Sequence, residues 1–407
     1  MTIEARAREF DLADPLAAAW SLFRLPEGVI YLDGNSLGAL PRATPQVLAR
    51  VVEEEWGAGL IGSWNRAGWF DMAARVGAKI APLIGAAPQE VIACDSTSIN
   101  LFKLIAAALQ LRPGRKVILS EPGNFPTDLY MIAGLEAQGL ARRRLVAPER
   151  LADALDEEVA LLLLTHVHYK TGAVHDMAAL TQAAHAAGAL VLWDLSHSAG
   201  AMPVDLNAAG ADFAVGCGYK YLCGGPGAPA YAFVAARHLA RLSQPLTGWF
   251  GHEAPFAFVD DYAPAPGIAR LLAGTPPILG LAALEVGVDL IASLGVARLY
   301  AKAQALSQFF LECLEALGVE LELASPADGA ARGSHLAFRH HEAHAICQAL
   351  IARGVIGDFR DPDVLRLGFA PAYLSFADIA AAARHLAEVL ARGEWRRPEY
   401  RRRAAVT

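Results

Sequence analysis

Continuous apolar runs, rather than alternating polar and apolar positions, mark the middle of this chain. Five such runs occupy residues 116–120, 159–167, 189–196, 213–216 and 230–234. Runs of this kind are typical of strands buried on both faces, as in a parallel sheet covered by helices. Ala-rich helical stretches separate them, for example 177–187, which Gly188 ends. The alternation of strands and helices predicts an α/β fold with a mainly parallel sheet.

The pattern changes beyond about residue 285. Two strands and three helices are predicted in the order 296–317 (helix), 319–324 (strand), 342–353 (helix), 364–369 (strand) and 377–392 (helix). This order predicts a smaller α+β domain. Residues 1–30, helical as far as Leu25 and Pro26, are expected to pack with it; residues 31–287 would form a large domain and residues 288–407 the small one.

Charge and cysteine content exclude several classes of protein. The net charge of -7 argues against nucleic-acid binding, which needs a basic surface. The five cysteines show no CxxC spacing, which favours reduced thiols in the cytoplasm over disulfides or a zinc site. The first residues lack the apolar core of a signal peptide, and no run approaches the ~20 apolar residues of a membrane span. We therefore expect a cytoplasmic protein.

A carboxylate and a histidine follow a strongly apolar strand. Asp194 ends the run ALVLWD, and His197 comes three residues later. Open α/β sheets bind ligands at the carboxyl ends of their strands, and a buried carboxylate needs a cationic partner. The protonated pyridine nitrogen of pyridoxal 5′-phosphate is such a partner. The alternative is an aspartate that only caps a turn.

Lys220 stands between a short apolar strand and a Gly-rich loop. Tyr219 and Tyr221 flank it, and the glycines that follow let the backbone approach a ligand closely. Desolvation in such a pocket makes a lysine a better nucleophile for an aldehyde. The alternative, a lysine that extends to the surface, leaves the nearby Asp194 and His197 without explanation.

Donors for a phosphate are expected at the start of a helix. A strand ends near Ala93, and Thr97 and Ser98 precede a helix that runs to about Leu111. Free N–H groups and two hydroxyls at a helix N-terminus form an anion site. The alternative is that Ser98 only caps the helix.

Two further segments fit the same chemistry. In SEPGNFPTDLY, Phe125 is placed to stack on a pyridine ring and Asp128 to hydrogen-bond near it, unless the segment is only a proline-containing turn. Trp249 and Thr275 lie in loop-like segments and are expected to reach the phosphate in a neighbouring subunit.

Taken together, these segments resemble the kynureninase family of fold-type-I pyridoxal-phosphate enzymes, related to the class V aminotransferases. The resemblance spans almost the whole chain. The motifs that carry it are YLDGNSLGALP (31–41), SWNRAGWF (63–70), DSTSINL (95–101), NFPTD (124–128), HYKTG (168–172), WDLSHSAG (193–200), GYKYLCGGPG (218–227), GWFGH (248–252), GTPPILGL (274–281) and LRLGFAPAYLSF (365–376). Each motif is moderately specific, whereas the ordered set is highly specific.

The resemblance implies a role for each matching residue. Lys220 resembles the lysine that binds the cofactor, Asp194 the partner of the pyridine nitrogen, and Tyr219 a proton donor and relay. The residues that resemble cofactor contacts are Thr97, Ser98, Phe125, Asp128, Thr171, Asp194, His197, Tyr219, Lys220, Trp249 and Thr275. Those that resemble substrate contacts are Asn35, Ser36, Trp64 and Arg366. No metal is implied.

Arg366 resembles the arginine that binds the substrate α-carboxylate. It shares a strand face with Val364 and Gly368, so its guanidinium needs a planar anion as partner. The alternative is a structural ion pair. Trp64 stands where bacterial, kynurenine-preferring members carry tryptophan and animal members that prefer the 3-hydroxylated substrate carry histidine.

The implied reaction is a hydrolysis of L-kynurenine, and with it of 3-hydroxykynurenine. Cleavage of the Cβ–Cγ bond yields anthranilate (or 3-hydroxyanthranilate) and L-alanine. The implied setting is the kynurenine pathway of tryptophan catabolism, which is linked to NAD biosynthesis, and the implied assembly is a homodimer with active sites at the subunit interface.

Three rival interpretations remain open from the sequence. The nearest is a class V aminotransferase or cysteine desulfurase on the same fold, although Cys313 and Cys347 lie in Ala/Leu-rich helices and look like core residues. A non-catalytic regulator that binds pyridoxal phosphate would carry a DNA-binding segment, and none is recognisable. A metal site at HHEAH (340–344) lacks the accompanying carboxylate–histidine set.

Overall fold

The computed structural model describes residues 1–403, and its centre is a seven-stranded sheet in the order β4-β10-β9-β8-β7-β5-β6. The strands are β4 (Val91–Ala93), β5 (Val117–Ser120), β6 (Arg142–Leu145), β7 (Val159–Thr165), β8 (Leu190–Asp194), β9 (Phe213–Gly216) and β10 (Tyr231–Val234). The strands from β9 to β6 pair in parallel, whereas β10 pairs antiparallel with β9 and β4. The predicted mainly parallel sheet is confirmed, with an antiparallel edge.

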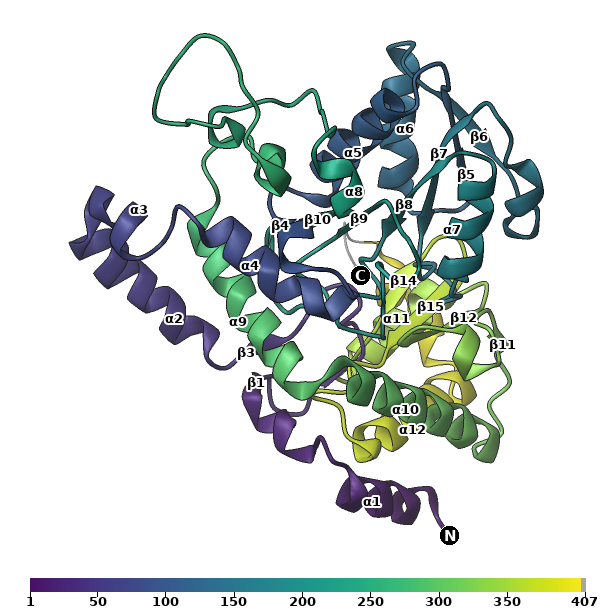
Figure 1. The fold of residues 1–407 in the computed structure, drawn as a ribbon. Helices are drawn as coiled ribbons and strands as arrows, with labels where there is room; N and C mark the ends of the chain where they lie inside the picture. Colours follow the sequence, from purple (N-terminus) through teal and green to yellow (C-terminus); the bar gives the residue numbers. More distant parts are fainter. Residues whose placement is uncertain (404–407) are drawn as a thin grey trace.

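Every residue of β7 and β8 is buried, which explains their apolar runs. The runs predicted at 159–167 and 189–196 continue past the strands, because the chain leaves the sheet at Thr165 and Asp194 to form loops. The helices of this part are α2 (Thr44–Arg50), α3 (Ser63–Arg66), α4 (Met72–Ile80), α5 (Thr97–Leu111), α6 (Pro126–Ala137), α7 (Met177–Ala186), α8 (Ala236–Leu239) and α9 (Ile278–Leu294). Figure 1 shows α4 beside β4 and α9.

A second, antiparallel sheet forms the C-terminal part in the order β11-β12-β15-β14. Its strands are β11 (Glu322–Leu323), β12 (His335–Arg339), β14 (Asp358–Arg360) and β15 (Val364–Gly368), and its helices are α10 (Val296–Ala316), α11 (Ala343–Ile351) and α12 (Phe376–Ala391). The strand predicted at 319–324 shrinks to β11, an edge strand that pairs with β12 only through two residues.

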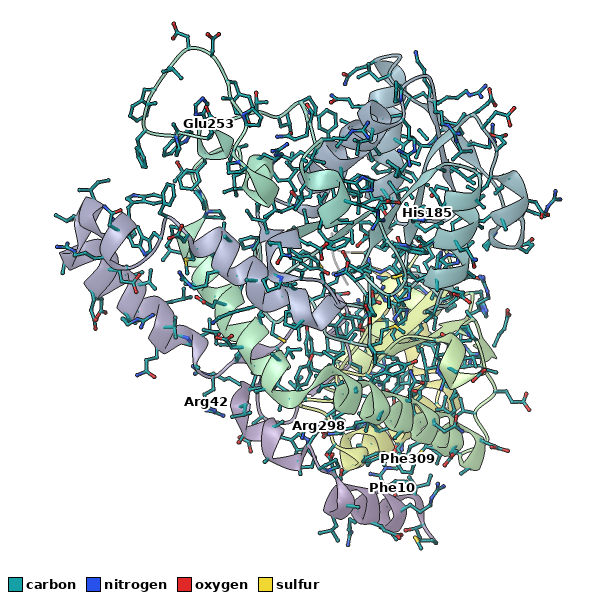
Figure 2. All side chains as sticks on the ribbon, viewed as in Figure 1. Phe10, Arg42, His185, Glu253, Arg298 and Phe309 are labelled. Carbon is teal, nitrogen blue, oxygen red and sulfur yellow. The ribbon has the colours of Figure 1, made fainter. Side chains whose placement is uncertain are left out.

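The N-terminal segment is less helical than expected. Helix α1 covers Ile3–Ala13, a 3-10 helix covers Ala17–Leu22, and Phe23–Arg24 form strand β1, which pairs with β3 (Leu40–Pro41). Pro15 has no backbone N–H to continue α1. Helix α1 packs against α12, and the Phe10 ring lies 5.4 Å from that of Phe309 on α10 (Figure 2).

A sharp bend separates the two sheets along the chain. Helices α9 and α10 meet at Gly295 at an angle of 78°. The boundary expected between residues 287 and 288 falls within α9. Within residues 1–403, no single helix is long and apolar enough to cross a membrane; α9 and α10 pass that test only as a bent pair.

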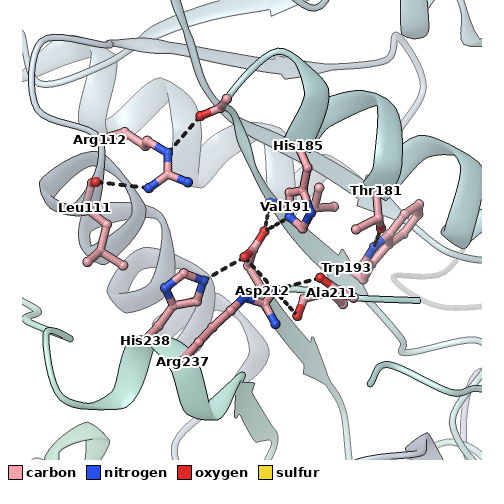
Figure 3. Close-up of polar contacts among 12 residues, drawn as sticks. Leu111, Arg112, Thr181, His185, Val191, Trp193, Ala211, Asp212, Arg237 and His238 are labelled. Atoms are coloured by element: carbon pink, nitrogen blue, oxygen red, sulfur yellow. Dashed lines mark hydrogen bonds and ion pairs between the residues drawn. The ribbon is translucent and has the colours of Figure 1, made fainter. Parts of the chain in front are cut away.

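A buried carboxylate lies at the amino-terminal edge of the parallel strands. Asp212, directly before β9, accepts hydrogen bonds from His185 Nε2 (2.8 Å), His238 Nε2 (2.6 Å), Arg237 Nη2 (2.7 Å) and the backbone N–H of Val191 (2.9 Å), as Figure 3 shows. Burial opposes its ionisation, but these hydrogen bonds outweigh burial and lower the pKa of Asp212. This saturated carboxylate ties α7, α8 and the sheet together.

Candidate active site

A cavity of about 210 Å³ opens at the opposite, carboxyl-terminal edge of the sheet. The register places Thr165 beside Asp194, and Asp194 beside Val215, so the ends of β7, β8 and β9 lie at one level. Ligands bind at this edge in open α/β sheets. The structure brings seven of the predicted residues together as its lining: Thr97, Ser98, Phe125, Asp194, His197, Tyr219 and Lys220.

Lys220 is buried and points toward a neutral histidine. Its Nζ lies 3.0 Å from His197 Nε2 and 5.6 Å from the centre of the Phe125 ring. Burial and the positive charge of Lys220 lower the pKa of His197 well below its usual range, so its ring accepts a hydrogen bond from the lysine. A side chain on Gly38 would lie 2.2 Å from the Lys220 carbonyl oxygen, so only glycine fits at this point of the LDGNSLG motif.

Two buried carboxylates have few donors: Asp194, which lines the cavity, and Asp128, whose ionisation the charge of Asp194 opposes. Asp194 accepts the backbone N–H of Ser196 (2.8 Å), and Asp128 accepts the Thr165 hydroxyl (3.2 Å) while its Oδ1 has no partner. Burial raises the pKa of Asp194, and burial with the negative charge of Asp194 raises that of Asp128 well above its usual range. The positive charge of Lys220 lowers both pKa values in part, but among the described residues no cation is in direct contact with either carboxylate.

The anion site at α5 differs in detail from the prediction. The helix begins at Thr97, and the N-cap is Ser96, whose hydroxyl accepts the N–H of Ile99 at 3.4 Å. The alternative in which Ser98 caps the helix is therefore wrong. Thr97 and Ser98 occupy the first turn, where backbone N–H groups have no partner within the helix. Both line the cavity and are free to bind an anion there.

Phe125 forms one wall of the cavity. It precedes Pro126, the first residue of α6, where the missing N–H of proline costs nothing. Its ring lies 5.3 Å from that of Tyr169 in an edge-to-face arrangement. Tyr219 lies near it with a pKa raised by burial and by the charges of Cys217 and Asp194, so its phenol keeps its proton at neutral pH.

Arg366 is bound within the protein rather than free. Its Nε donates to Asp358 Oδ1 (2.8 Å), its Nη2 to Asp358 Oδ2 and to the Ser36 hydroxyl (2.9 Å), and its Nη1 to the Tyr169 carbonyl. With its amide turned, the Asn35 carboxamide oxygen also accepts from this guanidinium. Arg366 therefore does form a structural ion pair, the alternative considered from the sequence. Asn35 and Ser36, both predicted to contact the substrate, are in contact with its guanidinium.

Eight predicted residues do not line this cavity within one chain: Asp128, Asn35, Ser36 and Arg366, described above, and four others. The Thr171 hydroxyl lies 3.0 Å from His168 Nδ1. Trp64 on α3 packs against Trp69 and Phe250, at ring distances of 5.9 and 5.8 Å. The other two, Trp249 and Thr275, are exposed.

Sequence reasoning missed six residues of the site. Four of them line the cavity, namely Ser96, Thr127, Thr165 and Ser196, and the other two, Asp358 and Arg360, lie on the strand next to Arg366. The motif GDFRDPDVLRLG carried a usable signal, because a turn between two strands places Asp358 opposite Arg366.

The fold is shared with solved structures of low sequence identity. A cysteine desulfurase from Thermococcus onnurineus NA1 superposes with a TM-score of 0.80 at 19% identity, covering 93% of this chain and 98% of that one. A cysteine desulfurase from Escherichia coli gives a TM-score of 0.74 at 21% identity over 92% and 98% of the two chains. These likenesses confirm a fold-type-I architecture.

Sequence relatives are far more similar. The chain is 49% identical to the kynureninase of Pseudomonas fluorescens and 50% identical to that of Burkholderia mallei, and each alignment covers 100% of both chains. Residues 299–386 match the kynureninase C-terminal domain. Identity of this level over the full length, together with the cavity at Lys220, shows that the chain belongs to the kynureninase family.

Proposed function

We propose that this protein hydrolyses L-kynurenine to anthranilate and L-alanine, with pyridoxal 5′-phosphate attached at Lys220. The observation that carries the proposal is the buried group of Lys220, Asp194 and Asp128 in a chain half identical to kynureninases along its whole length. Cysteine desulfurases share the fold but only about a fifth of the sequence.

The cavity suits this cofactor in charge and shape. Asp194 and Asp128 have no cation in direct contact among the described residues, and a protonated pyridine nitrogen supplies one. Thr97 and Ser98 at the start of α5 offer N–H and hydroxyl donors for a phosphate. Phe125 provides an aromatic surface for the ring, and Lys220 lies within reach of both ring and carboxylates. When bound, the cofactor withdraws electrons from the carbon atoms next to the substrate amine.

The residues of the chain divide the proton transfers among them. With the cofactor bound, the Lys220 amine would be the base that takes the substrate Cα proton, and the neutral His197 would accept a hydrogen bond from the resulting ammonium. Tyr219 keeps its phenolic proton at neutral pH and serves as the donor that returns a proton to the alanine moiety. Asp194 holds positive charge at the pyridine nitrogen.

The direct test is anthranilate emission from purified holoenzyme mixed with L-kynurenine. Release of anthranilate and alanine in equal amounts supports the proposal, and absence of both overturns it. Borohydride reduction followed by peptide mapping tests the attachment site independently of turnover. The label is expected on Lys220; a label on Lys79, Lys103 or Lys170 would contradict the assignment.

The cysteines argue against a desulfurase. All five are free and buried within the described part of the chain, whereas a desulfurase needs an accessible cysteine to accept sulfur. Sulfide release from L-cysteine in the same preparation is expected to stay at background. Buried reduced thiols also support a cytoplasmic location.

We extend the proposal to a homodimer with shared active sites. A groove of about 720 Å³ lined by apolar residues lies beside Cys223 and Gly224, next to the Lys220 loop. Exposed apolar side chains gather in the segments 56–61 and 256–259, and such patches mark interfaces. In this arrangement Trp64, Trp249 and Thr275 of one subunit reach the cavity of the other.

Mixing two inactive variants tests this assembly. A Lys220→Arg chain and a Trp249→Ala/Thr275→Ala chain are each expected to be nearly inactive alone. A one-to-one hybrid contains one intact site per mixed dimer and should regain about a quarter of wild-type activity. Sites contained within single chains would regain none.

Trp64 is proposed to set the substrate preference. A tryptophan beside the aromatic ring favours L-kynurenine, and a polar replacement would favour the 3-hydroxylated form. Trp64→His is therefore expected to shift the ratio of the two kcat/KM values toward 3-hydroxykynurenine. An unchanged ratio in a two-substrate kinetic comparison would remove this residue from the substrate site.

A further inference from the structure

The hydrogen bonds of Arg366 leave it too few donors to hold a carboxylate alone. A guanidinium has five N–H groups. In Arg366, one goes to each oxygen of Asp358, one to the Ser36 hydroxyl and one to the Tyr169 carbonyl. One N–H remains, whereas a fork onto a carboxylate needs two.

Arg360 has the donors that Arg366 lacks. Its Nη2 donates to Asp358 Oδ2 (2.6 Å) and to the Ser36 hydroxyl (3.2 Å). Its Nε is buried without a partner, and its Nη1 makes no hydrogen bond to the described residues. The side chain is 37% exposed, so a ligand can reach it.

The sheet register holds both guanidiniums on one face. Asp358 pairs with Arg366 across β14 and β15, and Arg360 lies two residues further along β14 on the same side. Asp358 and the Ser36 hydroxyl contact both arginines. Tyr169 connects this group to the cavity, because its carbonyl accepts from Arg366 and its ring packs edge-to-face on Phe125, which lines the cavity. Burial raises the pKa of Tyr219, another lining residue, and the positive charge of Arg360 partly offsets that rise.

The charges of this group do not cancel. Burial opposes ionisation of Asp358, but Arg366 outweighs it and lowers its pKa to about 2, so this carboxylate is ionised. Two guanidiniums against one carboxylate leave one positive charge at a largely buried place. Asp33 does not cancel it in acid, since burial and the charge of Asp358 raise its pKa to about 7. One monoanionic ligand completes the balance.

We propose that Arg360 is a second substrate-binding residue, and that the α-carboxylate of the substrate is shared between Arg360 and the remaining N–H of Arg366. This inference rests on the proposed function for the identity of the substrate. Recognition of the substrate carboxylate then depends on two cations, Arg360 and Arg366, which Asp358 holds together. Ligands whose carboxylate is amidated or absent lose this contact.

Arg360→Gln tests the assignment in the holoenzyme. KM for L-kynurenine is expected to rise about tenfold to a hundredfold with kcat within about threefold, because an N–H donor to a charged group is lost. Arg360→Lys keeps the charge and should recover part of the loss. The matched control is Arg339→Gln, an arginine of the same sheet that pairs with Asp363 on the surface and should leave KM unchanged.

Two non-reacting probes separate binding from folding. The desamino analogue of kynurenine keeps the carboxylate, and kynurenamine lacks it. By calorimetry, Arg360→Gln should weaken the first about tenfold or more and leave the second unchanged. Equal weakening of both probes, or of neither, would overturn the proposal. If the wild type binds the carboxylate probe but releases no anthranilate, the proposed function fails and the role of Arg360 stands.

Discussion

Asp194 and Asp212 are buried carboxylates at opposite edges of one sheet, and they differ in the number of hydrogen-bond donors around them. Asp212 has four donors from three elements, and its pKa falls; Asp194 has one backbone donor, and its pKa rises despite the nearby Lys220. Both side chains are almost fully buried. Burial alone therefore does not distinguish the two carboxylates, whereas the number of donors does, and a shortage of donors at a cavity supports a functional role.

The same contrast extends to the neighbours of each carboxylate. Around Asp194, polar atoms of Asp128 and His197 have no partner. Around Asp212, His185, His238 and Arg237 all donate to it. At the edge with Asp212 the hydrogen bonds are made within the protein, whereas at the edge with Asp194 buried polar atoms have no partner among the described residues, which supports the proposed ligand site.

The largest effect is expected at Lys220. Lys220→Arg should lower kcat by about a thousandfold or more, because the variant loses both covalent attachment and the base. Thermal unfolding of the apoenzyme should change little, since the amine contributes a single hydrogen bond to His197. Residual turnover above a tenth of wild type would place the reactive amine elsewhere.

Replacing Asp194 tests whether its shortage of donors serves catalysis. Asp194→Asn should lower kcat by about a hundredfold or more, with KM within about threefold, since the charge acts where electrons accumulate. Stopped-flow kinetics against L-kynurenine measures both constants. Near-normal turnover would show that the cofactor needs no anion at this position and would break the comparison.

Asp212→Asn is the matched replacement at the other edge. Loss of the charged acceptor should lower the free energy of unfolding by about 2–4 kcal/mol, because three side-chain donors lose it. The folded fraction should keep kcat and KM. Denaturant unfolding measures the free energy of unfolding. A fall in kcat without a fall in stability would contradict a structural role for Asp212.

The smallest effect concerns pH and a third carboxylate, Asp33, with a pKa raised to about 7 by burial and by Asp358. The groups around it are Asp358, Arg360, Arg366, Tyr31, Tyr221, Tyr373 and Cys347. A raised pKa means that Asp33 is protonated below that pH and ionised above it. Above pH 7 the ionised Asp33 competes with the substrate carboxylate for the positive charges of Arg360 and Arg366. KM should therefore rise roughly fivefold. Asp33→Asn should flatten the KM profile between pH 6 and about 8, and a profile that keeps its rise would assign it to another group.

Much of the large sheet was predictable because its strands are buried on both faces. The apolar runs located β5, β7, β8, β9 and β10. Strand β6 gave no such signal: it is an edge strand of three arginines and Leu145, exposed along most of its length. The direction of β10 was also hidden, since an antiparallel strand inside a covered sheet is as apolar as a parallel one.

The site was predictable where residues follow strands and helix starts, as Asp194, Lys220 and Thr97 do. The partner of Arg366 was missed: the turn in GDFRDPDVLRLG indicates that two strands pair, but the choice of Asp358 also needs the register of β14 and β15. Trp64, Trp249 and Thr275 do not line the cavity of their own chain, so the predicted approach of Trp249 and Thr275 to the phosphate of a neighbouring subunit stays a prediction. Residues close along one strand can be located from the sequence, whereas contacts between subunits cannot be read from the sequence of one chain.

The link between α1 and α12 has a consequence for synthesis of the protein. The Asp11 carboxylate accepts the N–H groups of Phe376 (2.7 Å) and Ala377 (3.0 Å), and β2 (Ile30–Tyr31) pairs with β13 (Val355–Ile356). Ribosomes add about 5–20 residues per second, so the first thirty residues wait tens of seconds for their partners. Until α12 is made, Asp11 and Phe10 of α1 have no partners there, so these contacts form late in folding.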